Sequence, residues 1–242
     1  MMQMVSAFEG SLEMNKVVLI TGANRGIGLA ASELFLNKGY DVIFTARDEI
    51  KGKKAMKSLG ESARLHFHRL DISSDDSVNK ILSYVEDSFG RLDVLVNNAA
   101  INYDTWQKTV SADMNLVLDT INVNVLGAWR LIQAFTPMMK KKSFGRIVNM
   151  SSGLGAFKGM GSGTPAYSIS KAALNALTVK MGNVFGGTNI KVNALCPGWV
   201  RTDMGGMGAT LSPEEAAEEI YWLASNDELQ GQFIRYRNVI DY

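Results

Sequence analysis

Short apolar runs alternate along this chain with longer stretches of helical periodicity, and this alternation limits the available folds more than any other feature. Six runs rich in β-branched or other apolar residues indicate buried strands, at residues 16–21, 40–45, 64–70, 92–96, 145–150 and 189–195. Helices are predicted near residues 26–38, 74–89, 113–140, 166–185 and 213–225. Strands that alternate with helices pair in parallel through right-handed crossovers. The pattern therefore predicts one α/β domain, a doubly wound parallel sheet with helices on both faces.

The composition excludes several classes of protein. The chain has 242 residues, of which 46% are hydrophobic and 20% charged, as in a globular domain and unlike a disordered chain. Its 25 basic and 24 acidic side chains leave a net charge of +1, which provides no field to gather nucleic acid or an anionic membrane. No apolar run approaches the roughly 20 residues of a membrane-spanning helix. We expect neither nucleic acid nor membrane as a partner.

The single cysteine and the two histidines offer little to a metal ion. Cys196 alone cannot form a disulfide framework or a multi-cysteine zinc site, and we expect it to be a small packed residue. His66 and His68 share one face of a predicted strand, but no third ligand of a suitable kind lies nearby in the sequence. We expect no metal site.

The first residues differ from the rest of the chain. They contain Glu9 and Glu13 and show neither the basic start nor the apolar core of a secretory signal. We expect a disordered extension over residues 1–14, followed by one domain over residues 15–242, in a cytoplasmic protein.

Three glycines follow the first predicted strand. Parallel sheets of this kind bind ligands beyond the carboxyl ends of their strands, where Gly22, Gly26 and Gly28 precede a predicted helix. Such glycines let the backbone turn tightly and let a phosphate approach the start of the helix, where free N–H groups and the helix dipole favour an anion. The spacing is neither G-x-G-x-x-G nor that of a phosphate-loop NTPase. A purely geometric role for the glycines is the alternative.

The motif Thr-Gly-x-x-x-Gly-x-Gly at residues 21–28 resembles the cofactor turn of the short-chain dehydrogenase/reductase family. Further motifs of that family follow in the same order over roughly residues 15–240. Residues 45–48 and a carboxyl end without Asp-Gly-Gly are more similar to the carbonyl-reductase branch. The resemblance implies a single-domain Rossmann fold that binds a nicotinamide dinucleotide. In the turn, it implies cofactor contacts from Gly22, Asn24, Arg25, Gly26, Ile27 and Gly28.

The end of the second predicted strand favours NADP(H) over NAD(H). Ala46 stands where an acid would accept hydrogen bonds from a free 2′-hydroxyl, and Arg47 follows it. A guanidinium suits a 2′-phosphate by charge and by its planar donors, and Arg25 is a second candidate for the same phosphate. Asp48 gives the competing interpretation, because an acid in this region marks NAD enzymes, but it lies one position too far along. A solvated surface charge is the alternative role of Arg47.

The third and fourth predicted strands end in further family motifs. The resemblance implies that Asp71 contacts adenine and that Ile72 packs nearby, although a capping role for Asp71 fits equally well. It also implies that Asn98 and Ala99 line the cofactor site. The family usually has glycine where this chain has Ala100, and we expect only a mild effect on the wall of the site.

Lys171 lies four positions after Tyr167, so the two side chains share one face of a predicted helix. A phenol with a pKa of about 10 is a poor proton shuttle near neutrality. A nearby ammonium and the positive nicotinamide of the oxidised cofactor would lower the pKa of Tyr167 towards working pH. The resemblance implies that Tyr167 is the general acid/base and that Lys171 lowers its pKa and binds the ribose.

Two polar residues complete the implied catalytic set. By resemblance, Ser152 binds the substrate carbonyl oxygen, with Ser151 as the second candidate and a strand-end cap as the alternative role. Asn124 matches the family residue that helps to hold a water chain to Lys171. The alternative for Asn124 is a satisfied structural hydrogen bond. After the sixth strand, the resemblance implies cofactor contacts from Pro197, Gly198, Val200 and Thr202.

Two glycine-rich segments are predicted to shape the substrate site. Residues 199–212 suit a mobile lid, and residues 153–165 are expected to form the mouth. The apolar side chains expected there are Tyr103, Trp106, Leu154, Phe157 and Met160, all of which have a loop anchor as the alternative role. An apolar mouth favours an aldehyde, ketone or quinone over a sugar phosphate.

The predicted function is the NADPH-dependent reduction of a small-molecule carbonyl to an alcohol. An alcohol dehydrogenase working in the oxidative direction is one alternative. A catalytically silent NADP(H)-sensing regulator is another, although it has no need of the Tyr–Lys–Ser–Asn set. A sugar epimerase or dehydratase would want a longer chain and a different glycine spacing. A homodimer or homotetramer is expected, through the predicted helices at 113–140 and 166–185.

Overall fold

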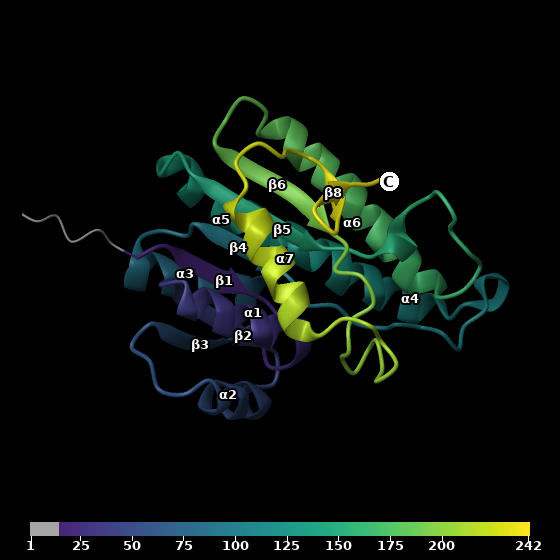
Figure 1. Ribbon diagram of the computed structural model, residues 1–242, viewed down its shortest axis with the longest axis horizontal. Coiled ribbons are helices and arrows are strands. Elements are labelled where there is room, and N and C mark those ends of the chain that lie inside the picture. Colours follow the sequence, from purple (N-terminus) through teal and green to yellow (C-terminus); the bar gives the residue numbers. More distant parts are fainter. Residues whose placement is uncertain (1–14) are drawn as a thin grey trace, which may run out of the picture.

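The computed structural model describes residues 15–242, which form one eight-stranded sheet with helices on both faces (Figure 1). The predicted extension over residues 1–14 lies outside the described residues. The strand order is β3-β2-β1-β4-β5-β6-β7-β8, and each neighbouring pair is parallel except β7 with β8. This order confirms the predicted doubly wound α/β sheet and adds one antiparallel strand at its edge. The strands are β1 (Val17–Ile20), β2 (Asp41–Ala46), β3 (Leu65–Arg69), β4 (Val94–Asn97), β5 (Gly145–Met150), β6 (Ile190–Leu195), β7 (Phe233–Arg235) and β8 (Asn238–Val239).

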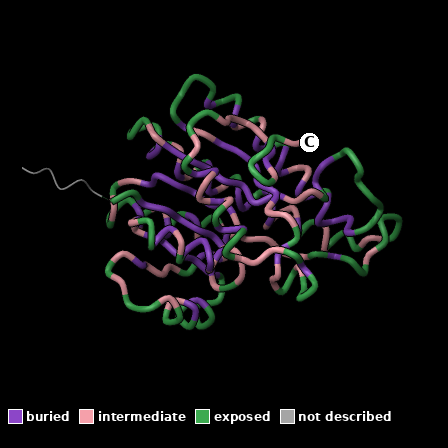
Figure 2. The backbone as a smooth tube through the Cα atoms, viewed as in Figure 1, coloured by how far each residue is buried: buried purple, intermediate pink, exposed green. Residues whose placement is uncertain are grey.

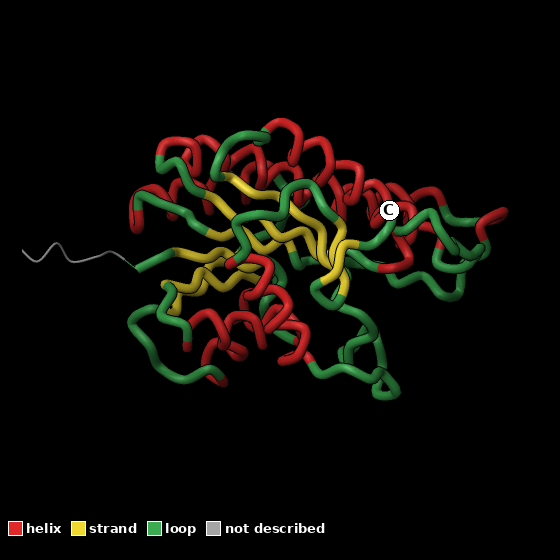
Figure 3. Tube along the Cα trace, turned by 45° about the horizontal axis from the view of Figure 1, so that its top comes forward, coloured by secondary structure: helices red, strands yellow, loops and turns green. Residues whose placement is uncertain are grey.

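The strands are apolar because helices cover both faces of the sheet (Figure 3). Successive side chains of a strand point to opposite faces. In β1, Val17 and Leu19 join the core beneath α3, α5 and α6, whereas Val18 and Ile20 join the core beneath α1 and α7. Figure 2 shows these buried strands running through the middle of the molecule. The helices are α1 (Gly26–Asn37), α2 (Glu49–Ser58), α3 (Asp75–Phe89), α4 (Met114–Ile121), α5 (Ala128–Lys141), α6 (Pro165–Val184) and α7 (Pro213–Ser225).

The sequence did not predict α2, β7 or β8. Only Gly52 and Ala55 of α2 are buried, so this helix carries too little apolar periodicity to be recognised. The carboxylate of Asp48 caps it, accepting a hydrogen bond from the backbone N–H of Lys51 at 3.0 Å. Asp48 therefore starts a helix. The two missed strands contain only three and two residues.

The predicted helix over residues 113–140 is wrong as a single α-helix. It is divided into α4 and α5 by a π-helical segment, Asn122–Gly127, which contains Asn124. π-Helical turns inside α-helices occur frequently at functional sites. At the end of this segment the backbone closely approaches the turn that follows β3, since a Cβ on Gly127 would lie 2.7 Å from the side chain of Ile72.

Within residues 15–242, no helix combines the length and the apolar character that a membrane crossing requires. The functional residues predicted from the sequence follow the carboxyl ends of β1 to β6, and the chain order reverses between β1 and β4. Ligands of open α/β sheets bind at such a reversal.

Candidate active site

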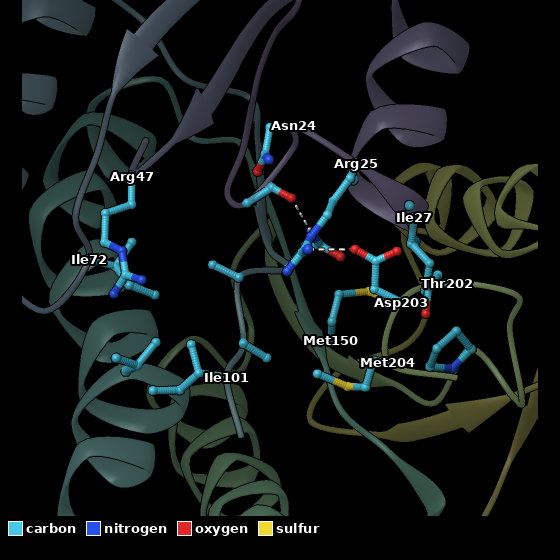
Figure 4. Close-up of a pocket in the computed structure, with 18 of the residues that line it drawn as sticks. Asn24, Arg25, Ile27, Arg47, Ile72, Ile101, Met150, Thr202, Asp203 and Met204 are labelled. Carbon is cyan, nitrogen blue, oxygen red and sulfur yellow. Dashed lines mark hydrogen bonds and ion pairs between the residues drawn. The ribbon is translucent and has the colours of Figure 1, made fainter. Parts of the chain in front are cut away.

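A cavity of about 490 Å³ opens at the carboxyl ends of the strands (Figure 4). Its lining includes residues that follow each of the strands β1 to β6, as expected for a sheet that reverses its order at β1 and β4. The predicted cofactor residues that line it are Gly22, Asn24, Arg25, Gly26, Ile27, Gly28, Arg47, Asp71, Ile72, Asn98, Ala99, Tyr167, Lys171, Pro197 and Thr202. Gly198 and Val200 line a second cavity instead.

The glycine turn requires glycine at defined positions. Gly22 has φ +63° and Gly26 has φ +53°, the left-handed region that other residues rarely adopt. A Cβ on Gly28 would lie 2.6 Å from the side-chain nitrogen of Asn98, so no larger residue fits there. That nitrogen donates to the backbone oxygen of Thr21 at 2.8 Å, which ties the end of β4 to the turn.

The start of α1 suits a phosphate. The helix begins at Gly26 with no side-chain cap and no acidic residue in its first turn. Its free N–H groups and the positive end of its dipole therefore remain available to an anion at the cavity. The residues present fit the pyrophosphate of a dinucleotide.

Three arginines line this cavity, and two of them, Arg25 and Arg47, are the predicted partners of a 2′-phosphate (Figure 4). Arg47, at the end of β2, forms no ion pair with any of residues 15–242. Arg25 forms an ion pair with Asp203, which belongs to the segment after β6. Arg47 therefore has no acidic partner among the described residues, whereas Arg25 already has one; Arg201, the third arginine of the lining, donates to the backbone oxygens of Ala209 and Thr210.

Asp71 also lines the cavity, and its carboxylate accepts hydrogen bonds from Ser73 N at 3.0 Å and Ser73 Oγ at 2.6 Å. Partial burial acts to raise the pKa of Asp71, but these hydrogen bonds and the nearby arginines outweigh it and hold the pKa below its usual value. Asp71 thus holds the turn before α3, whereas the helix itself is capped by Ser74, so the capping alternative for Asp71 is not found. Contact with adenine stays a prediction.

Tyr167 and Lys171 occupy the first turns of α6 and both line the cavity. The Lys171 ammonium donates to the backbone oxygen of Met150 at 2.7 Å and lies 5.4 Å from the centre of the Tyr167 ring. Burial lowers the pKa of Lys171 to about 8, because desolvation disfavours the charged amine.

Burial also raises the pKa of Tyr167 above its usual value, and the neighbouring Ser152 hydroxyl offsets this only in part. The predicted lowering of the Tyr167 pKa is therefore not found in the protein without its cofactor. Desolvation of the phenol is the largest cause of the raised pKa.

The two candidate serines differ in their contacts. Ser151 is buried, and its hydroxyl donates to Asn175 Oδ1 at 2.6 Å. Ser152 is less buried, and its hydroxyl accepts a hydrogen bond from Leu154 N at 3.2 Å, which caps a short 3₁₀ turn. Ser152 lines the second cavity and Ser151 lines both. These contacts favour Ser152 as the substrate-binding serine, because its hydroxyl proton is not donated to Asn175.

Asn124 is 2% exposed, and its amide makes three hydrogen bonds. Its oxygen accepts from Ile101 N at 2.9 Å, and its nitrogen donates to Ile101 O at 3.2 Å and Ser170 Oγ at 3.0 Å. These contacts match the alternative role of Asn124, that of a buried structural residue whose amide is hydrogen-bonded within the protein. The predicted water chain to Lys171 is not tested by these contacts.

Asp104 is a site residue that the sequence did not reveal. Its carboxylate is fully buried and accepts hydrogen bonds from the backbone N–H groups of Ala166 at 2.9 Å and Tyr167 at 3.1 Å. It thereby caps the turn of α6 that carries the phenol, where the local N-cap residue Thr164 makes no side-chain cap bond. Because 62 residues separate Asp104 from Ala166, no local sequence pattern could have shown the contact.

Buried polar contacts hold α6 further along its length. Asn175 accepts from Ser151, and Thr178 Oγ1 accepts from Asn149 Nδ2 at 2.9 Å. Gly155 packs so closely on α6 that a Cβ there would lie 2.7 Å from Lys171 Cβ. These contacts fix the helix relative to β5, and hence the positions of the phenol and the ammonium.

A second cavity of about 440 Å³ adjoins the first, and Tyr167 lines both. Of the predicted substrate-mouth residues, Tyr103 and Leu154 line it. Trp106, Phe157 and Met160 do not line it, and Phe157 is 73% exposed, so their place at the mouth stays a prediction. The predicted lid contributes Trp199, Val200, Thr202, Met204 and Gly205.

The remaining candidates are packed residues. Cys196 is buried, and its sulfur accepts a hydrogen bond from Gly153 N at 3.1 Å. His66 lies edge-on to Phe89 and His68 lies beside Tyr84, with ring centres 4.9 Å and 5.1 Å apart. Among residues 15–242, no three metal-binding side chains cluster.

Comparisons with known proteins agree with this geometry. The family model of the short chain dehydrogenases matches residues 16–209. Carbonyl reductase [NADPH] 1 of Bos taurus is 32% identical, over 94% of this chain and 99% of the relative. Among solved structures, carbonyl reductase Sniffer of D. melanogaster superposes with a TM-score of 0.85 at 29% identity, covering 93% of this chain and 98% of that one.

A further solved structure, the NADPH-bound carbonyl reductase from chicken fatty liver, has a TM-score of 0.85 at 26% identity and covers 94% of this chain and 99% of that one. The match thus extends over nearly the full length of the relatives. The chain belongs to the short-chain dehydrogenase/reductase family and is similar within it to the carbonyl reductases.

Proposed function

We propose that this protein is an oxidoreductase that uses NADPH to reduce an aldehyde, ketone or quinone to an alcohol. The observation that carries the proposal is the position of Tyr167, which lines both the larger cavity, with the glycine turn, and the smaller cavity beside it. A phenol at this boundary reaches a substrate and a cofactor at once. The similarity to carbonyl reductases, two of them named for NADPH, supports the same chemistry.

NADPH, when bound, supplies a hydride for the carbonyl carbon. The chain supplies the proton that completes the alcohol. Because burial raises the pKa of Tyr167, the phenol of the resting protein is protonated and ready to act as a general acid.

The other groups support this proton transfer. The hydroxyl of Ser152, in the second cavity, is placed to donate a hydrogen bond to the carbonyl oxygen and to orient it. The ammonium of Lys171, 5.4 Å from the phenol ring centre, stabilises the phenolate left after the proton has moved. A silent regulator would bind NADP(H) with no use for this buried pair.

Removing the phenolic hydroxyl tests the proposal directly. We expect Tyr167→Phe to lower kcat with a panel of aldehydes and ketones by about 10²- to 10⁴-fold, because the general acid is lost. The Kd for NADPH, measured by fluorescence titration, should change by less than about twofold, because binding does not require the proton.

Tyr221→Phe is the matched control, since Tyr221 packs edge-on against Phe35 at 5.4 Å and lines neither cavity. It should stay close to wild type. A Tyr167→Phe enzyme that still turns over would contradict the assigned role.

Arg47 is proposed to select NADPH by binding its 2′-phosphate. Arg47→Ala should raise KM for NADPH by about 10- to 100-fold and change KM for NADH little, because only NADPH carries that phosphate. Steady-state kinetics with both cofactors measures the difference. Arg64→Ala removes a guanidinium just before β3, at the end of that strand away from the cavity, and should leave both constants unchanged. Equal effects of Arg47→Ala on the two cofactors would refute the assignment.

We also propose that the protein forms a homodimer or homotetramer through α4, α5 and α6. These helices expose large apolar side chains, including Met114 and Leu118 four residues apart on α4, Trp129 on α5 and Ile169 on α6. Apolar surface of this kind on neighbouring elements is typical of an interface, and a second copy of the chain offers the same surface in return.

Sedimentation velocity tests this interface. The wild type should sediment as a dimer or tetramer, and Leu118→Glu should shift it to a smaller species, because the new charge would be buried without a partner. Val110→Glu places the same charge on an exposed side chain outside these helices and should change nothing. A monomeric wild type would disprove the proposal.

A further inference from the structure

The second cavity contains one charge. Of the described residues that line it, Arg235 on β7 is the only one with an ionisable side chain that is charged at neutral pH. The other large side chains of its wall are apolar or aromatic, among them Leu154, Trp199 and Met204. Arg235 is half-buried in this wall, where an anionic group of a ligand would find its charge partner.

Arg235 lies close to the reacting end of this cavity. A Cβ placed on Gly153 would lie 3.6 Å from Arg235 Nη1 and 3.8 Å from Cys196 Sγ. Gly153 directly follows Ser152, the serine proposed to bind the substrate carbonyl. The guanidinium is therefore within the length of a small substrate from the proposed carbonyl site.

Within residues 15–242, Arg235 has no acidic partner. Its Nε atom is buried and makes no hydrogen bond to any described residue. Arg237, two residues further along, shows what is missing, because its Nε donates to Glu219 at 2.9 Å. Buried arginine donors normally have acceptors, and a ligand in this cavity would supply the acceptor that Arg235 Nε lacks among the described residues.

The hairpin between β7 and β8 holds the guanidinium in place. The ring of Tyr236 packs against it, with 5.0 Å between Arg235 Cζ and the ring centre. Both turn residues, Tyr236 at φ +49° and Arg237 at φ +59°, adopt the left-handed conformation that favours glycine. Tyr236 also lies against Gly198, where a Cβ would be 2.6 Å from its hydroxyl.

We infer that Arg235 binds a carboxylate on the substrate, so that the preferred substrates are oxo acids with an apolar body between the carbonyl and the carboxylate. This inference rests on the proposed carbonyl reduction and specifies its substrate class. Planar guanidinium pairs with planar carboxylate through two parallel hydrogen bonds. A single cation balances one negative charge, whereas a phosphate dianion would leave a charge uncompensated against apolar walls.

Binding of the dinucleotide does not account for the presence of Arg235 in the second cavity. The first cavity, which has the glycine turn, is lined by Arg25, Arg47 and Arg201 and does not include Arg235. The cation of the second cavity is thus separate from the charges available to the cofactor phosphates.

Two matched substrates test the inference: 4-carboxybenzaldehyde and its methyl ester, which differ in charge and little in shape. The measured quantity is the ratio of kcat/KM for the acid to kcat/KM for the ester, with NADPH. Arg235→Met keeps the length of the side chain without its charge and should lower this ratio by about 10- to 100-fold, through KM of the acid. Arg235→Lys keeps the charge but not the paired donors and should restore part of the ratio.

Arg237→Met is the control, because it removes the same charge from the same hairpin outside the cavity. It should leave the ratio unchanged. Each variant serves as its own control for folding, since ester turnover reports the intact site.

An acid-to-ester ratio that is equal in the wild type and in Arg235→Met overturns the carboxylate site and leaves carbonyl reduction standing. A wild-type protein that binds NADPH but reduces neither aldehyde, nor any of the neutral carbonyl panel, overturns the proposed function and this inference with it.

Discussion

A lysine ammonium held inside the protein is the constraint on which the active site depends. Lys171 is 3% exposed, and its Nζ donates to the backbone oxygen of Met150 at 2.7 Å. Keeping an amine there is costly, which is why its pKa falls to about 8. Tyr167 lies one helical turn before Lys171, with its ring centre 5.4 Å from the Lys171 Nζ. In a medium of low dielectric, an ammonium at this distance would stabilise a negative charge on the phenol.

The surrounding structure fixes these two groups and separates their tasks. Asp104 caps the turn that carries Tyr167, and contacts from Ser151 and Asn149 hold α6 against β5. The phenol then stands between two cavities whose charges differ. The larger has the glycine turn and Arg47, which suit phosphates, and the smaller has apolar walls and Arg235. Under the proposals made above, the site sorts its two ligands by the number and position of their negative charges.

Much of this fold could be predicted because its strands are buried on both faces. Continuous apolar runs gave six of the eight strands, and the residues after them line the cavity. Features with a weak sequence signal, or with contacts between distant residues, were not predicted. Helix α2 buries only two residues, and Asp104 meets α6 across 62 positions. Arg235 sits on a strand of three residues, too short to be recognised. The pKa of Tyr167 depends on its burial, which spacing along a helix cannot show.

The proton-donating state of Tyr167 can be measured directly. Tyrosinate absorbance of the wild type, with Tyr167→Phe as the blank, gives the pKa of this phenol in the free protein and with NADP⁺ bound. The account predicts a pKa above the ordinary value of about 10 in the free protein, lowered by about one unit or more when the positively charged nicotinamide of NADP⁺ is present. A phenol that titrates normally in the free protein, or whose pKa does not fall with NADP⁺, would contradict it.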